Sequence, residues 1–412
     1  MTREQLIALC DSARATLPAL QSATSRDTIL SALPAALTAA KQKILAANAL
    51  DLDRARAKGI SPAMLDRLTL TEQRISDIAA SIEEVRALPD PLKCEYEDTR
   101  PNGMHITRHR VPLGVIAMIY EARPNVTVDA SVLCLKSGNA VILRGGSEAI
   151  ETNRAIVAVL RDALEPFGAR DAVALVEDTD RESVNILLTL RGHVDLVIPR
   201  GGAGLIRNVV DNARVPVIET GAGNCHVYVH KDADIDMAVN IIINAKTQRP
   251  SVCTAAETLL CDREIAPRFL PAAAAALREK GVELRADETA ARYVEGATPA
   301  TEDDFAREYN DFILAVGVVD GVEQAVSHVN KYGTRHSEAI VTEDRAAAEY
   351  FLTHVDAAAL YHNASTRFTD GGVFGMGAEI GISTQKLHVR GPFAMEALTT
   401  TQYRVYGDGQ VR

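Results

Sequence analysis

Residues 114–218 alternate between short apolar runs and longer amphipathic segments, and this alternation constrains the fold more than any other feature. Each apolar run has the length of a buried strand, and each intervening segment carries apolar residues at helical spacing. Strand and helix in repeated alternation predict right-handed crossovers and a parallel sheet covered by helices. The expected strands are 114–120, 140–143, 172–176, 194–198 and 215–218, and the expected helices are 127–136, 148–164, 181–190 and 204–213.

Glycines and arginines follow the expected strands, at the edge where parallel sheets bind their ligands. The segments are Tyr120–Asn125, Arg144–Ser147, Pro199–Gly204 and Glu219–Asn224, and three of the four are glycine-rich. Glycine lets backbone N–H groups approach a phosphate, and the start of a following helix adds partial positive charge. The Gly-x-Gly-x-x-Gly fingerprint does not follow the first strand, and glycine-rich loops also occur as plain turns. The loops indicate a phosphate-containing ligand without identifying it.

Size and charge restrict the class of protein. A chain of 412 residues predicts two or three domains. It has no apolar run of membrane-spanning length and no secretory signal at its N-terminus, so we expect no membrane contact. A net charge of −11 argues against nucleic-acid binding and means that an anionic substrate would need local arginines. Six scattered cysteines and ten histidines show no disulfide or metal-ligand spacing, which fits a cytoplasmic protein without a metal site.

Three further regions complete the predicted organisation. Residues 3–88 carry apolar residues at helical spacing and predict a run of helices. Residues 96–111 contain the hairpin signal Asn102-Gly103, and the β-like tail 398–406 is its expected partner. Residues 231–365 alternate again between helical and β-like patterns and predict a second α/β unit.

One cysteine is distinguished by its setting. Cys253 lies in a polar segment between the helix-like run 235–245 and the β-like run 258–261, with Arg249 and Pro250 just upstream. A partly exposed thiol near positive charge is readily held as a reactive thiolate. Four other cysteines lie in apolar helical patterns or at the ends of β-like runs, where we expect a cysteine to be buried. They are Cys10, Cys134, Cys225 and Cys261.

The order of these motifs resembles the aldehyde dehydrogenase superfamily and, within it, the glutamate-5-semialdehyde dehydrogenases, also called γ-glutamyl phosphate reductases. The resemblance covers nearly the whole chain and is strongest at 115–125, 248–260, 329–340 and 363–391. The last segment includes Phe368-Thr369-Asp370-Gly371-Gly372, which other aldehyde dehydrogenases do not share. Thr254 departs from the family, which commonly has asparagine after the nucleophile.

The resemblance implies an aldehyde-dehydrogenase-like α/β fold in three parts. Residues 1–95 and 114–230, rejoined by about 366–390, would form a Rossmann-type parallel-sheet nucleotide-binding domain. Residues 231–365 would form the α/β catalytic domain. Residues 96–113 with 391–412 would form a β-ribbon for oligomerisation, so we expect a homodimer or a higher homo-oligomer.

The resemblance also implies a reaction. It is the NADPH-dependent reduction of L-glutamyl 5-phosphate to L-glutamate 5-semialdehyde and phosphate through a cysteine thioester, the second step of proline biosynthesis. The chain has no kinase-like region, so the labile substrate would come from a separate glutamate kinase, and a transient contact between the two proteins stays open.

Three catalytic roles follow from the same resemblance. Cys253 would be the nucleophile. Asn125 is a candidate donor to the oxyanion, with a plain turn residue as the alternative. Glu219 matches the acid that activates water in acid-forming relatives, and here it would be structural or a proton relay.

Five residues would hold the cofactor NADPH. Arg144 and Ser147 follow the second strand, where an arginine without an acid favours a 2′-phosphate. Gly201 and Gly202 would lie against the pyrophosphate at a helix start. Glu308 corresponds to the acid that binds the hydroxyls of the nicotinamide ribose.

The substrate brings a carboxylate, an ammonium group and a phosphate. Arg123, Arg249, Arg367 and His336 are candidates for binding the anions, against solvated arginines and a structural histidine as the alternatives. Two rival functions stay open. The first is oxidation of a free aldehyde to an acid with Glu219 as the base, and the second is a non-catalytic protein on the same scaffold.

Overall fold

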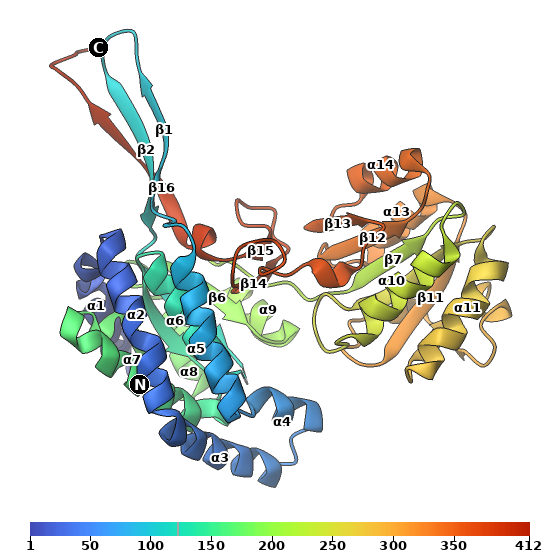
Figure 1. Ribbon diagram of the computed structural model, residues 1–412, viewed down its shortest axis with the longest axis horizontal. Coiled ribbons are helices and arrows are strands. Elements are labelled where there is room, and N and C mark those ends of the chain that lie inside the picture. The colour runs from blue at the N-terminus through green and yellow to red at the C-terminus, as the bar shows by residue number, and fades with distance from the viewer. Residues whose placement is uncertain (122) are drawn as a thin grey trace. The chain divides into compact units, whose positions relative to one another are not determined.

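The computed structural model describes residues 1–121 and 123–412, apart from the side chains of residues 62, 63 and 203, and its chain divides into two compact units (Figure 1). Unit 1 comprises Met1–Thr220, Gly375–Gly381 and Phe393–Arg412. Unit 2 comprises Gly221–Phe374 and Ile382–Pro392. The chain thus leaves unit 1 after Thr220 and returns to it twice.

A parallel four-stranded sheet forms the centre of unit 1. The strands lie in the order β5 (Val173–Leu175), β4 (Ala140–Arg144), β3 (Val115–Tyr120) and β6 (Leu196–Arg200). All residues of β3, β4 and β5 are buried, which explains their unbroken apolar sequences. Four of the five predicted strands are therefore confirmed.

The prediction of a fifth strand at 215–218 is wrong. This segment makes one isolated bridge to β6, in which Val197 donates to the Pro216 carbonyl and Ile218 donates back to the Val197 carbonyl. Pro216 has no N–H group, so the segment cannot continue a regular ladder of hydrogen bonds.

Nine helices among the described residues of unit 1 pack against this sheet or against one another. Thr2 begins the first helix with a capping box, and Thr71 begins the fifth by accepting from the Arg74 N–H, with Glu72 in the first turn. The helices are α1 (Arg3–Ala15), α2 (Ala23–Ala39), α3 (Lys41–Ala57), α4 (Pro62–Leu68), α5 (Glu72–Ala87), α6 (Pro124–Lys136), α7 (Ile150–Leu164), α8 (Arg181–Leu188) and α9 (Ala203–Asn212).

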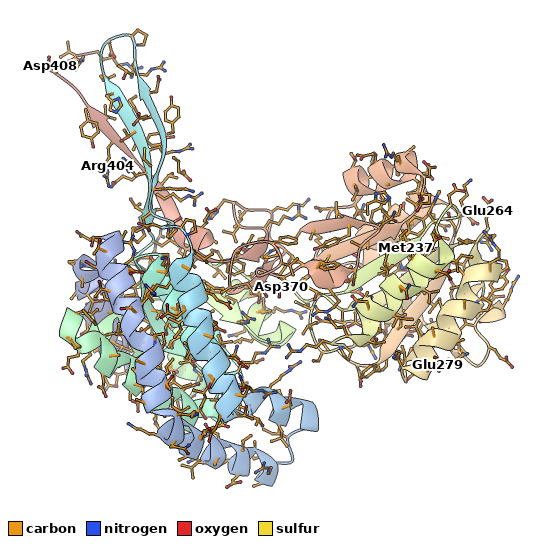
Figure 2. The ribbon with its side chains drawn as sticks, viewed as in Figure 1. Met237, Glu264, Glu279, Asp370, Arg404 and Asp408 are labelled. Atoms are coloured by element: carbon orange, nitrogen blue, oxygen red, sulfur yellow. The ribbon has the colours of Figure 1, made fainter. Side chains whose placement is uncertain are left out.

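A three-stranded antiparallel ribbon extends from unit 1 (Figure 1). β1 (Cys94–Thr99) and β2 (His105–Pro112) form the predicted hairpin, and β16 (Thr399–Tyr406) pairs with β2 along its whole length. The predicted pairing of hairpin and tail is confirmed. Figure 2 shows Arg404 on β16 and Asp408 beyond its end. The ribbon exposes large apolar side chains, namely Tyr96, Tyr403, Val405 and Tyr406.

Unit 2 contains a parallel seven-stranded sheet. The strands lie in the order β10 (Thr298–Pro299), β9 (Glu283–Ala286), β11 (Ile313–Val319), β8 (Ala256–Asp262), β7 (Cys225–Val229), β12 (Ser337–Val341) and β13 (Ala359–His362). The β-like runs 227–230, 258–261, 312–319, 339–341 and 358–361 predict five of these strands, but the edge strand β10 and its neighbour β9 were not predicted. Two further short strands, β14 (Gly381–Ser383) and β15 (Gly391–Phe393), form a separate sheet.

Alternate residues of these strands point to opposite faces of the sheet and into two separate cores. Val227 and Val229 of β7 pack with α10 (Ile235–Thr247) and α11 (Ala266–Glu279), whereas Tyr228 between them packs with α13 (Val322–Tyr332) and α14 (Arg345–His354). The short helix α12 (Glu302–Phe305) precedes β11. The second α/β unit predicted from the sequence is therefore confirmed. None of the helices in the described part of the chain combines the length and apolarity of a membrane span.

Asp129 on α6 makes the stability of unit 1 depend on pH. Burial raises the pKa of its carboxyl group to about 6, and the charge of Arg200 opposes that shift. The native state therefore binds more protons than the unfolded chain between about pH 4 and 6, and stability falls as pH rises through this window. Asp129→Asn has no group to ionise at this position. The free energy of unfolding of the variant minus that of the wild type should therefore increase from about pH 4 to 6 and then stay constant.

Urea unfolding of both proteins at several pH values measures this difference. Asp211→Asn, at an exposed position of α9, is the control and should differ from the wild type by a constant amount. A difference for Asp129→Asn that does not change between pH 4 and pH 7 would contradict the analysis.

Candidate active site

Cys253 lies in the loop that joins α10 to β8. Asp234 caps the start of α10 by accepting from the Met237 N–H, and the helix ends at Thr247. The chain then turns, with Ala255 donating to the Val252 carbonyl at 3.0 Å, and enters the fully buried strand β8. Cys253 is half-buried in this turn. The predicted setting, a thiol in a loop between a helix and a strand, is what the structure has.

A short 3₁₀ turn, Thr366–Phe368, supports the Cys253 loop from the C-terminal part of unit 2. Thr366 Oγ1 donates to the Thr254 carbonyl at 2.7 Å. Arg367 donates through Nε to Gln248 Oε1 at 2.9 Å and through Nη1 to Thr254 Oγ1. Thr254, the residue that departs from the family pattern, therefore receives the hydrogen bond of an arginine.

Positive charge lies beside the Cys253 sulfur. Burial lowers the pKa of the Arg367 guanidinium, and the nearby Cys253 sulfur acts in the opposite direction, as a favourable charge partner. Arg249 is exposed in the Cys253 loop, and its positive charge also lowers the pKa of Arg367 by repulsion. The structure brings these two of the predicted substrate-binding residues together with Cys253. A cation beside a thiol favours the thiolate, which is the nucleophilic form.

A second thiol lies directly behind the first. Cys225 is buried at the start of β7, and its Sγ donates to the Cys253 carbonyl at 3.1 Å. Burial raises the pKa of Cys225 well above its usual value, so this sulfur stays a thiol at neutral pH. Of the two neighbouring cysteines, only Cys253 has both exposure and a cation.

His336 lies in the core of unit 2. Burial lowers its pKa to about 4, so the ring is uncharged at neutral pH. Its Nδ1 lies 2.9 Å from Ser337 Oγ, and that hydroxyl lies 2.7 Å from Thr369 Oγ1. A buried, neutral imidazole offers no charge to an anion. The surroundings of His336 are therefore those of a structural histidine, the alternative given in the sequence analysis.

Glu308 and the Cys253 loop meet at one glycine. Glu308 Oε1 accepts a hydrogen bond from the Gly223 N–H at 2.8 Å. A Cβ atom on Gly223 would lie 1.5 Å from the Cys253 carbonyl oxygen, so only glycine fits. Gly223 was not among the predicted site residues, although the glycine-rich segment Glu219–Asn224 that contains it had been noted for its position after a strand.

Three predicted residues belong to unit 1 and border the carboxyl ends of its strands. Arg123 precedes α6 as its N-cap residue and is half-buried. Asn125, exposed in the first turn of α6, donates through Nδ2 to Asp129 Oδ2 at 3.0 Å. Glu219 is half-buried in the segment that leaves unit 1. All three belong to unit 1, whereas Cys253 belongs to unit 2.

The four remaining predicted residues lie at the same edge of the unit 1 sheet. Arg144 is buried at the end of β4, and its Nη atoms donate to the carbonyls of Gly145, Thr179 and Asp180, which holds two loops together. Ser147 is exposed just beyond. The loop also contains an acid, because the Glu148 carboxylate lies over Gly146.

Gly201 and Gly202 precede α9 and face a carboxylate. Glu121 Oε2 accepts a hydrogen bond from the Gly202 N–H at 2.8 Å, and a Cβ on Gly201 would lie 2.6 Å from the same oxygen. This carboxylate occupies the position of an anion at the helix start, where the helix dipole stabilises negative charge. The donor set therefore fits the pyrophosphate of a dinucleotide, which would take the place of Glu121.

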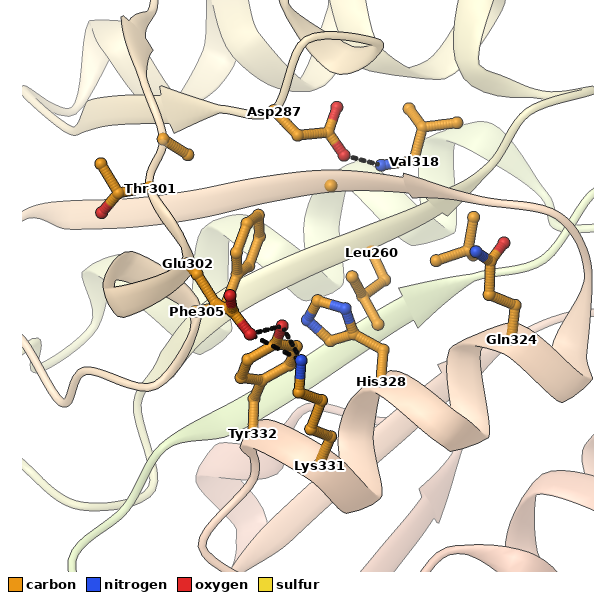
Figure 3. A pocket seen from close by; sticks show the side chains of 13 residues that line it. Leu260, Asp287, Thr301, Glu302, Phe305, Val318, Gln324, His328, Lys331 and Tyr332 are labelled. Carbon is orange, nitrogen blue, oxygen red and sulfur yellow. Dashed lines mark hydrogen bonds and ion pairs between the residues drawn. The ribbon is translucent and has the colours of Figure 1, made fainter.

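A pocket of about 450 Å³ opens on another part of unit 2, between β11, α12 and α13 (Figure 3). Lys331 Nζ donates to Glu302 Oε1 at 2.6 Å, and the Tyr332 hydroxyl contacts the same oxygen at 2.9 Å. His328 and Phe305 line its wall. Among the described residues around this pocket, none is a predicted site residue, so it is separate from the Cys253 loop.

One group in the described part of unit 2 has the spacing of metal ligands. His230, Asp232 and Asp344 place one ligand atom each within 4.8 Å of one another. His230 Nδ1 lies 2.9 Å from Thr342 Oγ1, and Asp344 caps α14. Two of the three groups thus already have structural partners in the protein.

Comparison with known proteins identifies the family. A model of the aldehyde dehydrogenase family matches residues 1–291. The γ-glutamyl phosphate reductase of Moorella thermoacetica is 58% identical over 391 residues, which cover 94% of this chain and 94% of that protein. The γ-glutamyl phosphate reductase of Clostridium beijerinckii is 55% identical, with 95% of each chain covered.

Solved structures agree. The crystal structure of γ-glutamyl phosphate reductase from Thermotoga maritima is 46% identical and matches with a TM-score of 0.96 over 99% of each chain. An acetylating aldehyde dehydrogenase from Geobacillus thermoglucosidasius, 17% identical, shares the fold with a TM-score of 0.72 over 100% of this chain and 98% of that one. Because the family model covers most of the chain and relatives of this identity match over almost their whole length, the chain belongs to the γ-glutamyl phosphate reductases of the aldehyde dehydrogenase family.

Proposed function

We propose that this protein reduces L-glutamyl 5-phosphate to L-glutamate 5-semialdehyde and phosphate with NADPH, through a thioester on Cys253. The observation that carries the proposal is the position of the Cys253 sulfur, half-buried beside the Arg367 guanidinium and backed by the protonated Cys225. Family membership supports a nicotinamide cofactor and a place in proline biosynthesis.

Acyl transfer is the first step. The Cys253 thiolate attacks the carbonyl carbon of the acyl phosphate, and the tetrahedral intermediate expels phosphate to leave a thioester. Phosphate is a good leaving group, so the site needs cations to hold its charge more than it needs a strong acid. Arg367, which interacts with the Cys253 sulfur, and Arg249, which lies near enough to act on Arg367, would supply this positive charge.

Reduction is the second step. A bound reduced nicotinamide supplies the hydride that the thioester carbon accepts. Cys253 then leaves as thiolate and the aldehyde is released. The backbone N–H of Cys253, with Asn125 as a further candidate, would stabilise the oxyanion in both steps. Glu219 would act as a proton relay or a structural residue, because the acyl acceptor is phosphate and no water needs activation.

Five residues would hold the cofactor. Gly201 and Gly202 would bind the pyrophosphate at the α9 start, where a carboxylate already accepts one of their N–H groups. Glu308 would accept from the hydroxyls of the nicotinamide ribose. Arg144 and Ser147 would favour the 2′-phosphate of NADPH over NADH, Ser147 from an exposed position and Arg144 through the positive charge of its buried guanidinium.

The remaining assignments concern substrate and assembly. We propose that Arg123, Arg249 and Arg367 bind anions of the substrate, and that His336 orders the buried polar groups behind Cys253 instead of contacting substrate. The exposed apolar residues of the β1–β2–β16 ribbon support pairing with a second copy of the chain. We also propose a cytoplasmic location and transient contact with the kinase that makes the acyl phosphate.

The reverse reaction tests the function. Glutamate semialdehyde should reduce NADP only when phosphate is present, and Cys253→Ser should abolish turnover by more than about 1000-fold because an alkoxide leaves poorly from the intermediate. Cys94→Ser, on the exposed hairpin, is the control and should keep full activity. Phosphate-independent formation of glutamate would instead establish an aldehyde-oxidising enzyme, and full turnover by Cys253→Ser would establish a protein without cysteine catalysis.

Arg367 should be required for the reactivity of the thiol. Arg367→Met removes the cation and two hydrogen bonds to the Cys253 loop, so kcat/KM should fall about 100-fold. The rate of Cys253 alkylation by iodoacetamide should also need a higher pH to reach its plateau. Arg367→Lys should recover part of both effects, and Arg345→Met, exposed on α14, should show neither. An unchanged alkylation profile in Arg367→Met would exclude this role.

Gly223 should tolerate no side chain. In Gly223→Ala the new methyl group would lie 1.5 Å from the Cys253 carbonyl oxygen, so the Cys253 loop must shift. A displacement of about 1 Å should lower kcat about 100-fold. Gly204→Ala on α9, where nothing lies within 4 Å of the added atom, should leave the Cys253 alkylation rate and the melting temperature unchanged. A Gly223→Ala enzyme with wild-type kcat would show that the loop is free to move.

A further inference from the structure

A buried ion pair lies beneath the Cys253 loop. Lys246 in the last turn of α10 and Glu257 at the start of β8 are both 0% exposed, and their Nζ and Oε2 atoms are 2.5 Å apart. These two residues flank the loop that carries Cys253, so the pair joins the ends of that loop from inside the core.

Glu257 also holds the loop that carries Glu308. Its second oxygen, Oε1, accepts a hydrogen bond from the Asn310 N–H at 3.1 Å. Asn310 has a φ of +55°, a conformation that few residues other than glycine adopt, and a fixed acceptor for its N–H group helps to hold it. Glu308, two residues earlier, lies near enough for its charge to act on the Glu257 carboxyl group.

The Cys253 loop and the loop that carries Glu308 are connected at two places. Glu308 accepts from the Gly223 N–H, and Gly223 lies against the Cys253 carbonyl. The Cys253 loop and the Glu308 loop therefore touch at Gly223 on one side and share Glu257 on the other. Lys246 and Glu257 therefore support the Cys253 loop, and Glu257 also supports the Glu308 loop.

A buried ion pair is not explained by stability alone. Removing two charges from water costs several kcal/mol per ion, and well-packed apolar residues of the same size often stabilise a protein as well or better. Burial accordingly raises the pKa of Glu257 to about 7 and lowers that of Lys246, while each charge favours the ionised form of the other. The directional contacts to Lys246 and Asn310 are what apolar residues could not replace.

We propose that Lys246 and Glu257 are positioning residues that set the placement of the Cys253 thiol and of Glu308 relative to each other. This inference rests on the proposed function, in which Cys253 takes the acyl group and Glu308 holds the nicotinamide ribose. Neither residue contacts substrate or cofactor. They act through Cys253, Asn310 and Glu308.

Two double variants separate the two contacts. Lys246→Met/Glu257→Gln removes both charges but keeps an oxygen for the Asn310 N–H. Lys246→Met/Glu257→Leu removes both charges and that acceptor. Removing the charges together leaves no unpaired buried ion, so both variants should fold. Both should slow Cys253 alkylation by iodoacetamide, located by peptide mass spectrometry, by about tenfold. Only the leucine variant should also weaken NADPH binding, measured by fluorescence, by about tenfold.

The control is an ion pair in unit 1. Arg26, buried on α2, pairs with Asp90 at 2.7 Å. Arg26→Met/Asp90→Leu should lower the melting temperature and leave the alkylation rate and NADPH affinity unchanged. Wild-type values in both Lys246/Glu257 double variants, or equal losses in this control, would overturn the inference. If neither double variant folds, Glu257→Asp tests it, because the shorter acid keeps the charge but retracts from Asn310. Wild-type alkylation and NADPH affinity in Glu257→Asp would overturn the inference as well.

Glu308→Gln separates this inference from the proposed function. If Glu308→Gln weakens NADPH binding and the leucine variant does not, the positioning role is wrong and the cofactor role of Glu308 stands. If Glu308→Gln leaves NADPH binding unchanged, the cofactor role fails and the NADPH part of the inference is overturned with it.

Discussion

The ion pair between Lys246 and Glu257 is fully buried, and in the proposed arrangement the Cys253 loop depends on it. Both side chains are fully buried, so each ion is stable there only because the other is present. The pair joins α10 to β8, and Glu257 reaches on to Asn310. A core contact of this kind can hold a reactive loop in one position while leaving its outer surface open to substrate.

Local charge at the site differs from the charge of the whole molecule. The chain carries a net charge of −11, which repels an acyl phosphate at long range. Near Cys253, however, Arg367 and Arg249 concentrate positive charge. Burial has opposite consequences for the two neighbouring sulfurs. Cys225 is protonated behind the loop, whereas Cys253 is half-buried beside a guanidinium, the setting that the proposed nucleophile needs.

Sequence patterns were reliable where local periodicity decides the structure. The N-terminal helices, four strands of the unit 1 sheet and the pairing of the hairpin with the tail agree with the structure. They failed at 215–218, where apolar composition favoured a strand but Pro216 lacks the N–H group that a ladder needs. They also missed β9 and β10, because Glu-Leu-Arg-Ala at β9 and Thr-Pro at β10 lack the apolar runs by which the other strands were predicted.

The amino-acid sequence by itself determined the family, the α/β alternation and the choice of Cys253, because motifs and periodicity are local properties of the chain. Only the tertiary structure showed the contacts of Gly223, Cys225, Lys246 and Glu257, and it placed His336, predicted to be either a substrate-binding or a structural histidine, in the core. Gly223 meets Glu308 across 85 residues and Cys225 meets Cys253 across 28. Contacts between segments so far apart leave no spacing in the sequence, since they exist only after parallel strands bring their loops to a common edge.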